Sequence, residues 1–340
     1  MAEHAKAPVM ADVARLAGVS HQTVSRVING SPKLRPETRE RVQAAIESLG
    51  YRPNTAARAL GRGRSGMIGI IGTAGAEFGP VSIHRSVEEA ARDAGFLASS
   101  VNLTEMSRDA LDGAVEHLMT VGVEGMVMIA AHDAALEIVR AQRSGPPFVV
   151  VEGQLDRSNT AVVGVDQVAG ARAATEHLLH LGHREIVHVS GPLDWTEARS
   201  RLQGWRSAMH DAGVRPAEPI LGDWSSRSGF SAGQAVCDMP DVTAVFTAND
   251  QMAIGVLRAL HECGRFVPDD VSVIGFDDIP EAEFLIPPLT TVRQDFSAVG
   301  MRAIEALRLL MNGHSPTADL LEPSLVVRAS TGPPKSIGAY

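Results

Sequence analysis

The chain has 340 residues, of which 44% are apolar and 21% are charged, and its formal net charge is −9. This length and composition provide for a small domain beside a large one with a substantial core. No apolar run reaches membrane-spanning length and the first ten residues lack the apolar core of a secretory signal, so we expect a cytoplasmic protein rather than a membrane or secreted one.

The first predicted element is a helix-turn-helix between Met10 and Asn29. Ala14 provides the small residue needed at the helix contact, Gly18 the glycine at the sharp turn, and Ser20 the cap of the second helix. The joint core takes the apolar residues Val13, Val24 and Val27. The second helix then exposes its N-terminal polar side chains, as a recognition helix does in a major groove. The motif therefore predicts DNA as the partner, and the alternative is an ordinary αα-hairpin with a solvated polar face.

The distribution of charge supports this prediction. Residues 1–64 hold eleven Lys and Arg against five Asp and Glu, a net charge of +6, so the remainder carries −15. A basic segment is attracted to a duplex through neutralisation of phosphates, whereas an acidic remainder is kept away from it. We expect binding that weakens steeply with salt.

Two further helical stretches complete the N-terminal region. Residues 36–49 have apolar side chains at helical spacing and close a small bundle, with proline in the first turn and glycine at the end. Residues 51–60 are helix-competent and are followed by a glycine-rich linker at 61–66. An isolated helix of two turns is marginal in water, so we expect it to form only against another surface such as DNA.

From Met67 onward, strand-like runs alternate with amphipathic helical runs, which indicates βαβ units and parallel sheets. The predicted strands are 67–71, 96–101, 125–129, 148–151, 186–189, 244–247, 271–276 and 321–327. The predicted helices are 81–95, 109–121, 168–181, 197–213, 227–238, 251–263 and 296–312. These are too many for one compact sheet, so we expect two similar lobes with a ligand site in the crevice between them.

Residues that suggest other chemistry have simpler interpretations. Cys237 and Cys263 form no CxxC pair and are expected to be small core residues rather than a disulfide. His180 and His183 have no further Cys or His cluster that would complete a metal site. Motifs of phosphate-binding loops, zinc proteases, serine hydrolases and dinucleotide-binding folds are missing from the sequence. We therefore expect no enzyme activity, no metal and no cofactor.

Taken in order, several segments resemble the lactose repressor (LacI/GalR) family of bacterial transcription regulators. They are DVARLAGVSHQTVSRVING at 12–30, TRERV at 38–42, YRPNTAARAL at 51–60, HLLHLGHREI at 177–186, EARSRLQGW at 197–205, GDWSSRSGF at 222–230, FTANDQMAIG at 246–255, VIGFDDIP at 273–280 and PPLTTVRQDF at 287–296. The resemblance covers almost the whole chain. It implies a small all-α helix-turn-helix head and an α/β two-lobed periplasmic-binding-protein-like domain with parallel sheets.

By this resemblance, the head carries the DNA-binding residues. Three side chains of the recognition helix are candidates for reading bases. Gln22 can pair with adenine, Arg26 with guanine, and His21 with either. Four polar residues are expected to contact phosphates instead: Thr23, Ser25, Asn29 and Thr38. Arg35 departs from the family, since a Ser-type helix cap is commoner at its position.

The stretch 53–60 resembles the hinge helix of the family. Asn54 caps this helix or contacts the minor groove, Ala57 permits close approach, and Leu60 from each protomer is the wedge that opens a central base step. Packing of Leu60 against its own domain is the alternative. Because each head reads half a site, we expect a homodimer on an inverted repeat.

The resemblance also implies an effector site in the crevice. Arg201, Asn249 and Asp277 offer directional hydrogen bonds to vicinal hydroxyls, which is the chemistry of sugar recognition. Trp224, Phe276 and Trp195 are candidates for the apolar walls of the site. Glu152, Glu197 and Gln294 are further polar candidates, and Thr73 and Pro80 belong to the loop after the first strand. Glu152, Trp195 and Glu197 depart from the family pattern, which leaves the identity of the sugar open. The alternatives are a lobe-core role for Trp224 and a structural ion pair for Asp277.

Together these expectations describe a dimeric transcriptional repressor that a small saccharide releases from a palindromic operator. The expected domains are a head at 8–52, a hinge and linker at 53–66, and an effector-binding and dimerisation domain at 67–334. Within that domain the N-lobe takes about 67–163 and 294–321, and the C-lobe about 164–293 and 322–334. A regulator of the same fold that uses a purine or another corepressor, and a soluble sugar-binding protein, are the alternatives.

Overall fold

The computed structural model describes residues 8–28, 31, 34–51, 64–75, 77–105, 107–129, 145–152, 160–316 and 319–335. The chain divides into two compact units, Met1–Gly66 and Met67–Tyr340. We call the first unit the head and the second unit the body, and describe each by itself. None of the helices in these described ranges is both long and apolar enough to cross a membrane.

The head is built from α1 (Met10–Ala17), α2 (His21–Ile28) and α3 (Pro36–Leu49). Helix α1 ends at Gly18, whose φ of 64° lies in the left-handed region that glycine adopts without strain. The Ser20 hydroxyl oxygen accepts a hydrogen bond from the backbone N–H of Thr23 at 3.2 Å and so caps α2. Valines from all three helices meet in the core: Val13, Val24, Val27 and Val42. The predicted helix-turn-helix is confirmed.

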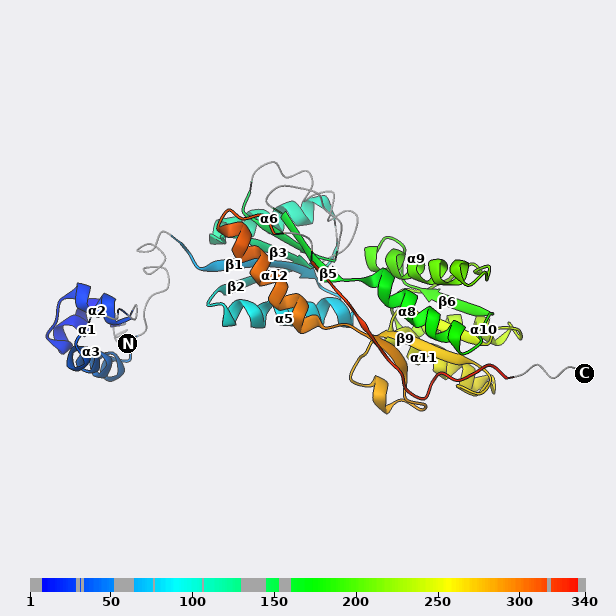
Figure 1. The fold of residues 1–340 in the computed structure, drawn as a ribbon. Coiled ribbons are helices and arrows are strands. Elements are labelled where there is room, and N and C mark those ends of the chain that lie inside the picture. The colour runs from blue at the N-terminus through cyan, green and yellow to red at the C-terminus, as the bar shows by residue number, and fades with distance from the viewer. Residues whose placement is uncertain are drawn as a thin grey trace, which may run out of the picture. The chain divides into compact units, whose positions relative to one another are not determined.

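The first lobe of the body, the N-lobe, has a parallel sheet with the strand order β11-β5-β4-β3-β1-β2. Its strands are β1 (Met67–Thr73), β2 (Leu97–Leu103), β3 (Met126–Ile129), β4 (Phe148–Val151), β5 (Thr160–Val165) and β11 (Asp319–Leu321). Helices α5 (Phe78–Asp93) and α12 (Phe296–Met311) pack together on one face, and α6 (Arg108–Val121) covers the other (Figure 1). The central strands are apolar throughout because both of their faces are covered.

The second lobe, the C-lobe, repeats this architecture with the order β12-β10-β9-β8-β6-β7, in which β12 alone of the described strands runs antiparallel. The strands are β6 (Ile186–Ser190), β7 (Ile220–Leu221), β8 (Ala244–Thr247), β9 (Ser272–Asp277), β10 (Thr290–Arg293) and β12 (Ser324–Val326). The helices are α8 (Gln167–His180), α9 (Thr196–Asp211), α10 (Ser226–Cys237) and α11 (Asp250–Glu262). Helices α8 and α9 cover one face of the sheet, and α10 and α11 cover the other.

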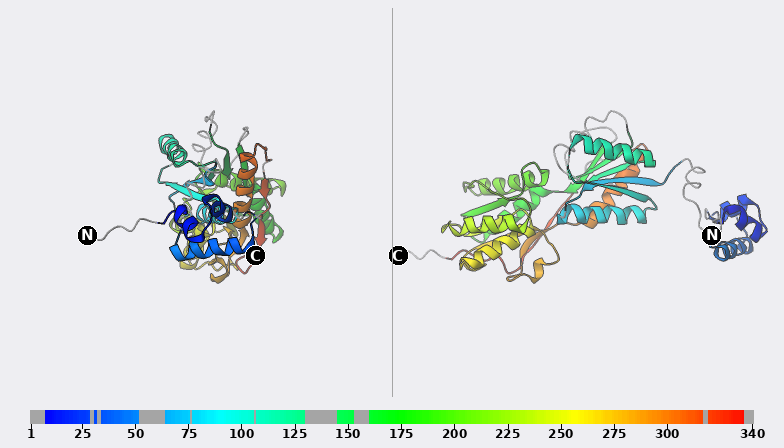
Figure 2. Two further views of the ribbon diagram at one scale, coloured as in Figure 1. Left: turned by 90° about the vertical axis from the view of Figure 1, so that its left-hand side faces the viewer. Right: turned by 180° about the vertical axis from the view of Figure 1, so that it is seen from behind.

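The chain crosses between the lobes between β5 and α8, between β10 and α12, and between β11 and β12, and Figure 2 shows the lobes on either side of these crossovers. The single strand predicted at 321–327 is therefore wrong. Pro323 separates it into β11 and β12, which belong to different sheets, because proline cannot donate to a ladder and the chain passes to the other lobe there. The expected two-lobed α/β fold with parallel sheets is confirmed.

The prediction for the cysteines is also wrong. Cys237 and Cys263 form a disulfide, with their Cα atoms 6.4 Å apart. Helices α10 and α11 belong to successive βα units on one face of the sheet, so both run in the same direction and end at the same edge of the lobe. Each cysteine stands at the C-terminal end of one of these helices, and the fold thus brings together two residues that the sequence separates by 26 positions.

Candidate functional site

Helix α2 contains most of the polar side chains that the sequence singled out for DNA contact. His21, Gln22 and Arg26 are exposed, and Thr23 and Ser25 are half-buried. The Thr23 hydroxyl lies 2.9 Å from that of Ser20, so it is held at the start of the helix. Thr38 is half-buried on α3, and Arg35 precedes that helix without a side-chain cap.

The predicted DNA-contacting residues Asn29, Asn54, Ala57 and Leu60 lie outside the described residues.

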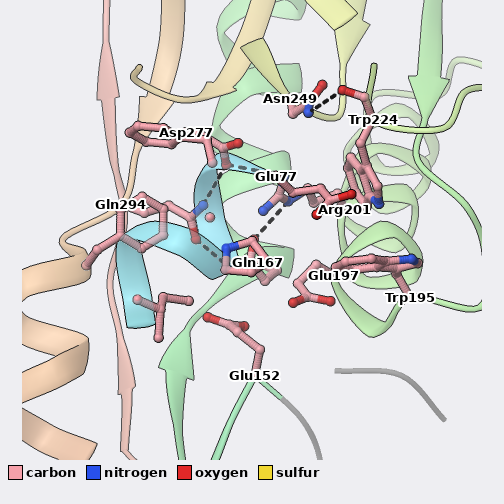
Figure 3. A pocket seen from close by; sticks show the side chains of 15 residues that line it. Glu77, Glu152, Gln167, Trp195, Glu197, Arg201, Trp224, Asn249, Asp277 and Gln294 are labelled. Atoms are coloured by element: carbon pink, nitrogen blue, oxygen red, sulfur yellow. Dashed lines mark hydrogen bonds and ion pairs between the residues drawn. The ribbon is translucent and has the colours of Figure 1, made fainter. Parts of the chain in front are cut away.

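A cavity lies between the two lobes of the body, with about 430 Å³ of space free of atoms when its opening to solvent is included (Figure 3). Nine of the eleven predicted effector residues line it: Pro80, Glu152, Trp195, Glu197, Arg201, Trp224, Asn249, Asp277 and Gln294. Phe276 lies behind this lining, with its ring centre 3.9 Å from the Arg201 guanidinium carbon. Thr73 is not brought to this cavity, because it lines a separate hollow beside α5 together with Pro80.

Four polar side chains form a closed ring of contacts in the wall of the cavity. Arg201 Nε donates to Gln167 Oε1 at 2.9 Å, and Gln167 Nε2 donates to Gln294 Oε1 at 2.8 Å. Gln294 Nε2 donates to Asp277 Oδ1 at 2.7 Å, and Arg201 Nη1 closes the ring 3.5 Å from the same oxygen. Arg201 also donates to the carbonyl oxygen of Ala248. Since buried charges are costly unless paired, these contacts hold the guanidinium in place at the cavity wall.

The aromatic wall of the cavity is formed by Trp195 and Trp224, whose ring centres lie 5.7 Å apart in an edge-to-face arrangement. Trp224 packs directly on Gly191, where a Cβ atom would meet its ring at 2.3 Å. The backbone carbonyl of Trp224 accepts a hydrogen bond from Asn249 Nδ2 at 3.0 Å. Asn249 Oδ1 also caps α11 by accepting the backbone N–H of Met252 at 2.9 Å, so two hydrogen bonds hold the Asn249 side chain in the wall.

Three residues of the cavity have backbones in the left-handed region, which side chains other than glycine rarely adopt. They are Glu152 with φ 61°, Trp224 with φ 71° and Asp277 with φ 109°. Such conformations cost energy and are concentrated at ligand sites, where the surrounding structure holds them. Each directs its side chain into the cavity at the end of a strand or beside the start of a helix.

Carboxyl groups dominate the electrostatics of the cavity. Burial raises the pKa of Glu152 to about 7 and that of Asp277 to about 6, although Arg201 counteracts both shifts. Burial and the nearby Glu152 raise the pKa of Glu197 to about 8. A cavity with a fixed guanidinium, several carboxyl groups and aromatic faces is suited to a small ligand that carries many hydroxyl or amino groups.

The sequence did not single out several residues that line the cavity: Glu77, Phe78, Gly79, Ile83, Gln167 and Phe296. Glu77, Phe78, Gln167 and Phe296 stand at or just before the start of α5, α8 or α12. Residues in the loops that follow the carboxyl ends of strands face the ligand crevice in such sheets, so the loop after the predicted strand 67–71 was an available signal for Glu77 and Phe78.

Comparison with known proteins gives matches over both units. Residues 9–54 match the family model of bacterial regulatory proteins of the lacI family, and residues 175–331 match that of a periplasmic binding protein-like domain. The lactose operon repressor of Escherichia coli K12 is 35% identical over 330 residues, which cover 96% of this chain and 91% of the repressor. The transcriptional regulator CelR of Thermobifida fusca is 35% identical over 341 residues, which cover 96% and 99% of the two chains.

Two solved structures extend the comparison. The lac repressor dimer bound to operator and the anti-inducer ONPF has a TM-score of 0.85 at 34% identity, over 96% of this chain and all 100% of that one. A complex of CelR with cellobiose has a TM-score of 0.71 at 34% identity, over 95% and 99% of the two chains.

Proposed function

The chain belongs to the lacI family of bacterial regulatory proteins, and from this premise we propose that it represses transcription from a palindromic operator and is released by a small saccharide. Like its relatives, it is a DNA-binding regulator and not an enzyme. We place it in the cytoplasm as a homodimer. The proposed domains are a head at 8–52, a hinge and linker at 53–66 and an effector domain at 67–334.

The single observation that carries the proposal is the presence, in one chain, of an exposed polar recognition helix and a cavity lined by both lobes. Gln22 and Arg26 are exposed on α2, and we propose that they pair with adenine and guanine in a major groove, with His21 as a third base-reading side chain. Thr23, Ser25, Asn29 and Thr38 are proposed to contact phosphates. In the hinge, Asn54, Ala57 and Leu60 are proposed to enter the minor groove, with Leu60 as the wedge.

The cavity supports a saccharide as the effector. The walls combine directional polar groups with two tryptophan rings, which suit the hydroxyls and the apolar face of a pyranose. Phe78, Pro80 and Phe296 come from the N-lobe side, whereas Trp195 and Trp224 come from the C-lobe. A ligand that touches both lobes binds their arrangements with different affinity, and this difference is what can shift the affinity for operator.

One experiment tests these proposals together. The purified protein selects duplexes from a random pool, and the selection is repeated with saccharides and with purines present. We expect enrichment of an inverted repeat that saccharides weaken; a requirement for a purine would instead establish the corepressor alternative. Unaltered operator binding after removal of residues 1–64 would contradict the assignment of the head, and no preference for any palindrome would contradict the function.

A further inference from the structure

The cavity between the lobes has more acidic side chains than a neutral saccharide needs. Among the described residues that line it, the carboxyl side chains are Glu77, Glu152, Glu197 and Asp277, and the cationic side chain is Arg201. If all were ionised, their charges would sum to −3. Burying uncompensated charge is costly, so either a ligand supplies positive charge or the carboxyl groups take up protons.

The contacts within the wall leave several polar atoms without partners. Asp277 is occupied by Gln294 and Arg201, and Glu152 Oε1 accepts the backbone N–H of Val165 at 2.8 Å. By contrast, Glu77 Oε2 and Glu197 Oε2 are shielded from solvent and have no hydrogen-bond partner among the described residues. When the two carboxyl groups are ionised, these oxygens are acceptors that only a hydrogen-bond donor can satisfy.

The aromatic wall adds a second, independent indication of a ligand. Trp224 is only 9% exposed, lines the cavity, and its Nε1 is buried without a hydrogen-bond partner among the described residues. Its neighbour Trp195 lies edge-to-face with it, so indole surface adjoins the carboxyl groups. Tryptophan faces attract cations as well as sugar rings. Figure 3 shows Glu197 beside Trp195, with Glu152 below Glu197 and farther from the tryptophan rings.

We propose that the effector is an amino sugar, whose ammonium group is held by Glu197 and Glu152 while its ring packs against Trp195 and Trp224. This inference rests on the proposed function and specifies the chemical class of its saccharide. An ammonium group donates three hydrogen bonds and accepts none, which matches a surplus of carboxyl acceptors. The described carboxyl groups do not form a cluster that could hold a metal ion, so an organic cation fits this lining better.

The protonation of the carboxyl groups in the cavity agrees with this assignment. Desolvation raises the pKa of Glu197 to about 8 and that of Glu152 to about 7. Arg201 and Asp277 act on both groups, and Glu152 also raises the pKa of Glu197. Bound ammonium favours the ionised carboxylates, so binding releases protons at neutral pH. A neutral sugar offers no such compensation, and its binding releases none.

Calorimetry on the full-length protein tests the proposal with matched pairs of sugars. The pairs are glucosamine and glucose, galactosamine and galactose, mannosamine and mannose, and the β-1,4-linked disaccharide of glucosamine and cellobiose. In at least one pair we expect the amine to bind about tenfold or more tightly than its neutral partner, as one charged hydrogen-bonded pair implies. Titrations in buffers of different ionisation enthalpy should show proton release for the amine alone.

Variants locate the effect. E197Q keeps the shape of the side chain and should lower the affinity for the amine about tenfold more than it lowers the affinity for the neutral partner. E218Q is the matched control, because Glu218 is exposed and outside the cavity, and it should change neither affinity.

The outcomes separate the two proposals. Neutral sugars that bind and release operator as well as or better than their amines would overturn the amino-sugar inference and leave the repressor function standing. If no saccharide of either kind bound a protein that still recognised its operator, both the inference and the saccharide-responsive part of the proposed function would be wrong.

Discussion

Replacing Gly191 with alanine should damage the effector cavity although Gly191 is not one of the residues that line it. Gly191 follows β6, and a Cβ atom there would lie 2.3, 2.4 and 2.6 Å from three carbon atoms of the Trp224 ring. Nonbonded carbon atoms prefer about 3.5–4.0 Å, so the ring has to retreat by about 1 Å or more. The backbone of Gly191 is not in the left-handed region, and the effect therefore comes from this close approach alone.

The size of the effect follows from the cost of overpacking. One extra carbon in a well-packed site costs about 1–3 kcal/mol, and if this is lost from ligand binding the affinity falls about fivefold to 150-fold. Calorimetric titration with the saccharide found by the screen measures the change. Operator affinity without ligand should stay the same, because the head is a separate unit.

A matched control distinguishes displacement of the tryptophan from a general effect of alanine. Gly113 lies on α6, where an added Cβ would meet nothing within 4 Å, so G113A should leave ligand affinity unchanged. Circular dichroism establishes that both variants remain folded. Ligand affinity in folded G191A within about twofold of the parent protein would refute the idea that Trp224 is seated on Gly191 to form the cavity wall.

Other predictions address the head, the cavity and the disulfide. Q22A should weaken binding to the selected operator by about 1–3 kcal/mol and leave the salt dependence unchanged, because it removes a base contact and no phosphate contact; electrophoretic titration at several salt concentrations measures both. R201A should abolish the response to saccharide while unliganded operator binding persists, and loss of both would assign Arg201 to folding instead. C237S should lower the free energy of unfolding by about 3.5 kcal/mol, as closure of a 26-residue loop by the bond to Cys263 implies, and a urea midpoint equal to that of the oxidised parent would contradict this. The pKa of Glu197 is raised from 4.5 to about 8 in the folded protein, so its contribution to stability is present below pH 4.5 and is lost as the pH rises towards 8. The urea midpoint of the parent protein should therefore fall between about pH 5 and pH 8, and E197Q should flatten this fall. Parallel plots of urea midpoint against pH for the two proteins would refute this prediction.

Local patterns in the sequence were sufficient to predict the head. The turn at Gly18, the cap at Ser20 and the valine core depend on residues within about twenty positions of one another, and the structure contains them as expected. In the body, periodicity predicted the long helices but missed β5, β7 and β10. Short apolar runs do not distinguish a strand from part of a helix.

The candidate cavity shows what local patterns leave out. Most of its residues were predicted through resemblance to a family, whereas Gln167 and Phe296 were missed because only the crossing of the chain between lobes brings them to the cavity. The disulfide was missed for a similar reason. The spacing of its cysteines carries no information until helices α10 and α11 are known to end at the same edge.

The ring that joins Arg201, Gln167, Gln294 and Asp277 has a polarity. Each glutamine accepts a hydrogen bond through its amide oxygen and donates one through its amide nitrogen to the next residue of the ring. Rotating either amide by about 180° would therefore break two hydrogen bonds at once. The two glutamines stand where separate chain segments pass from lobe to lobe. A ligand that hydrogen-bonds to the carboxylate of Asp277 would therefore weaken the contacts at both crossovers at the same time. Binding at this one group would then affect both connections between the lobes together.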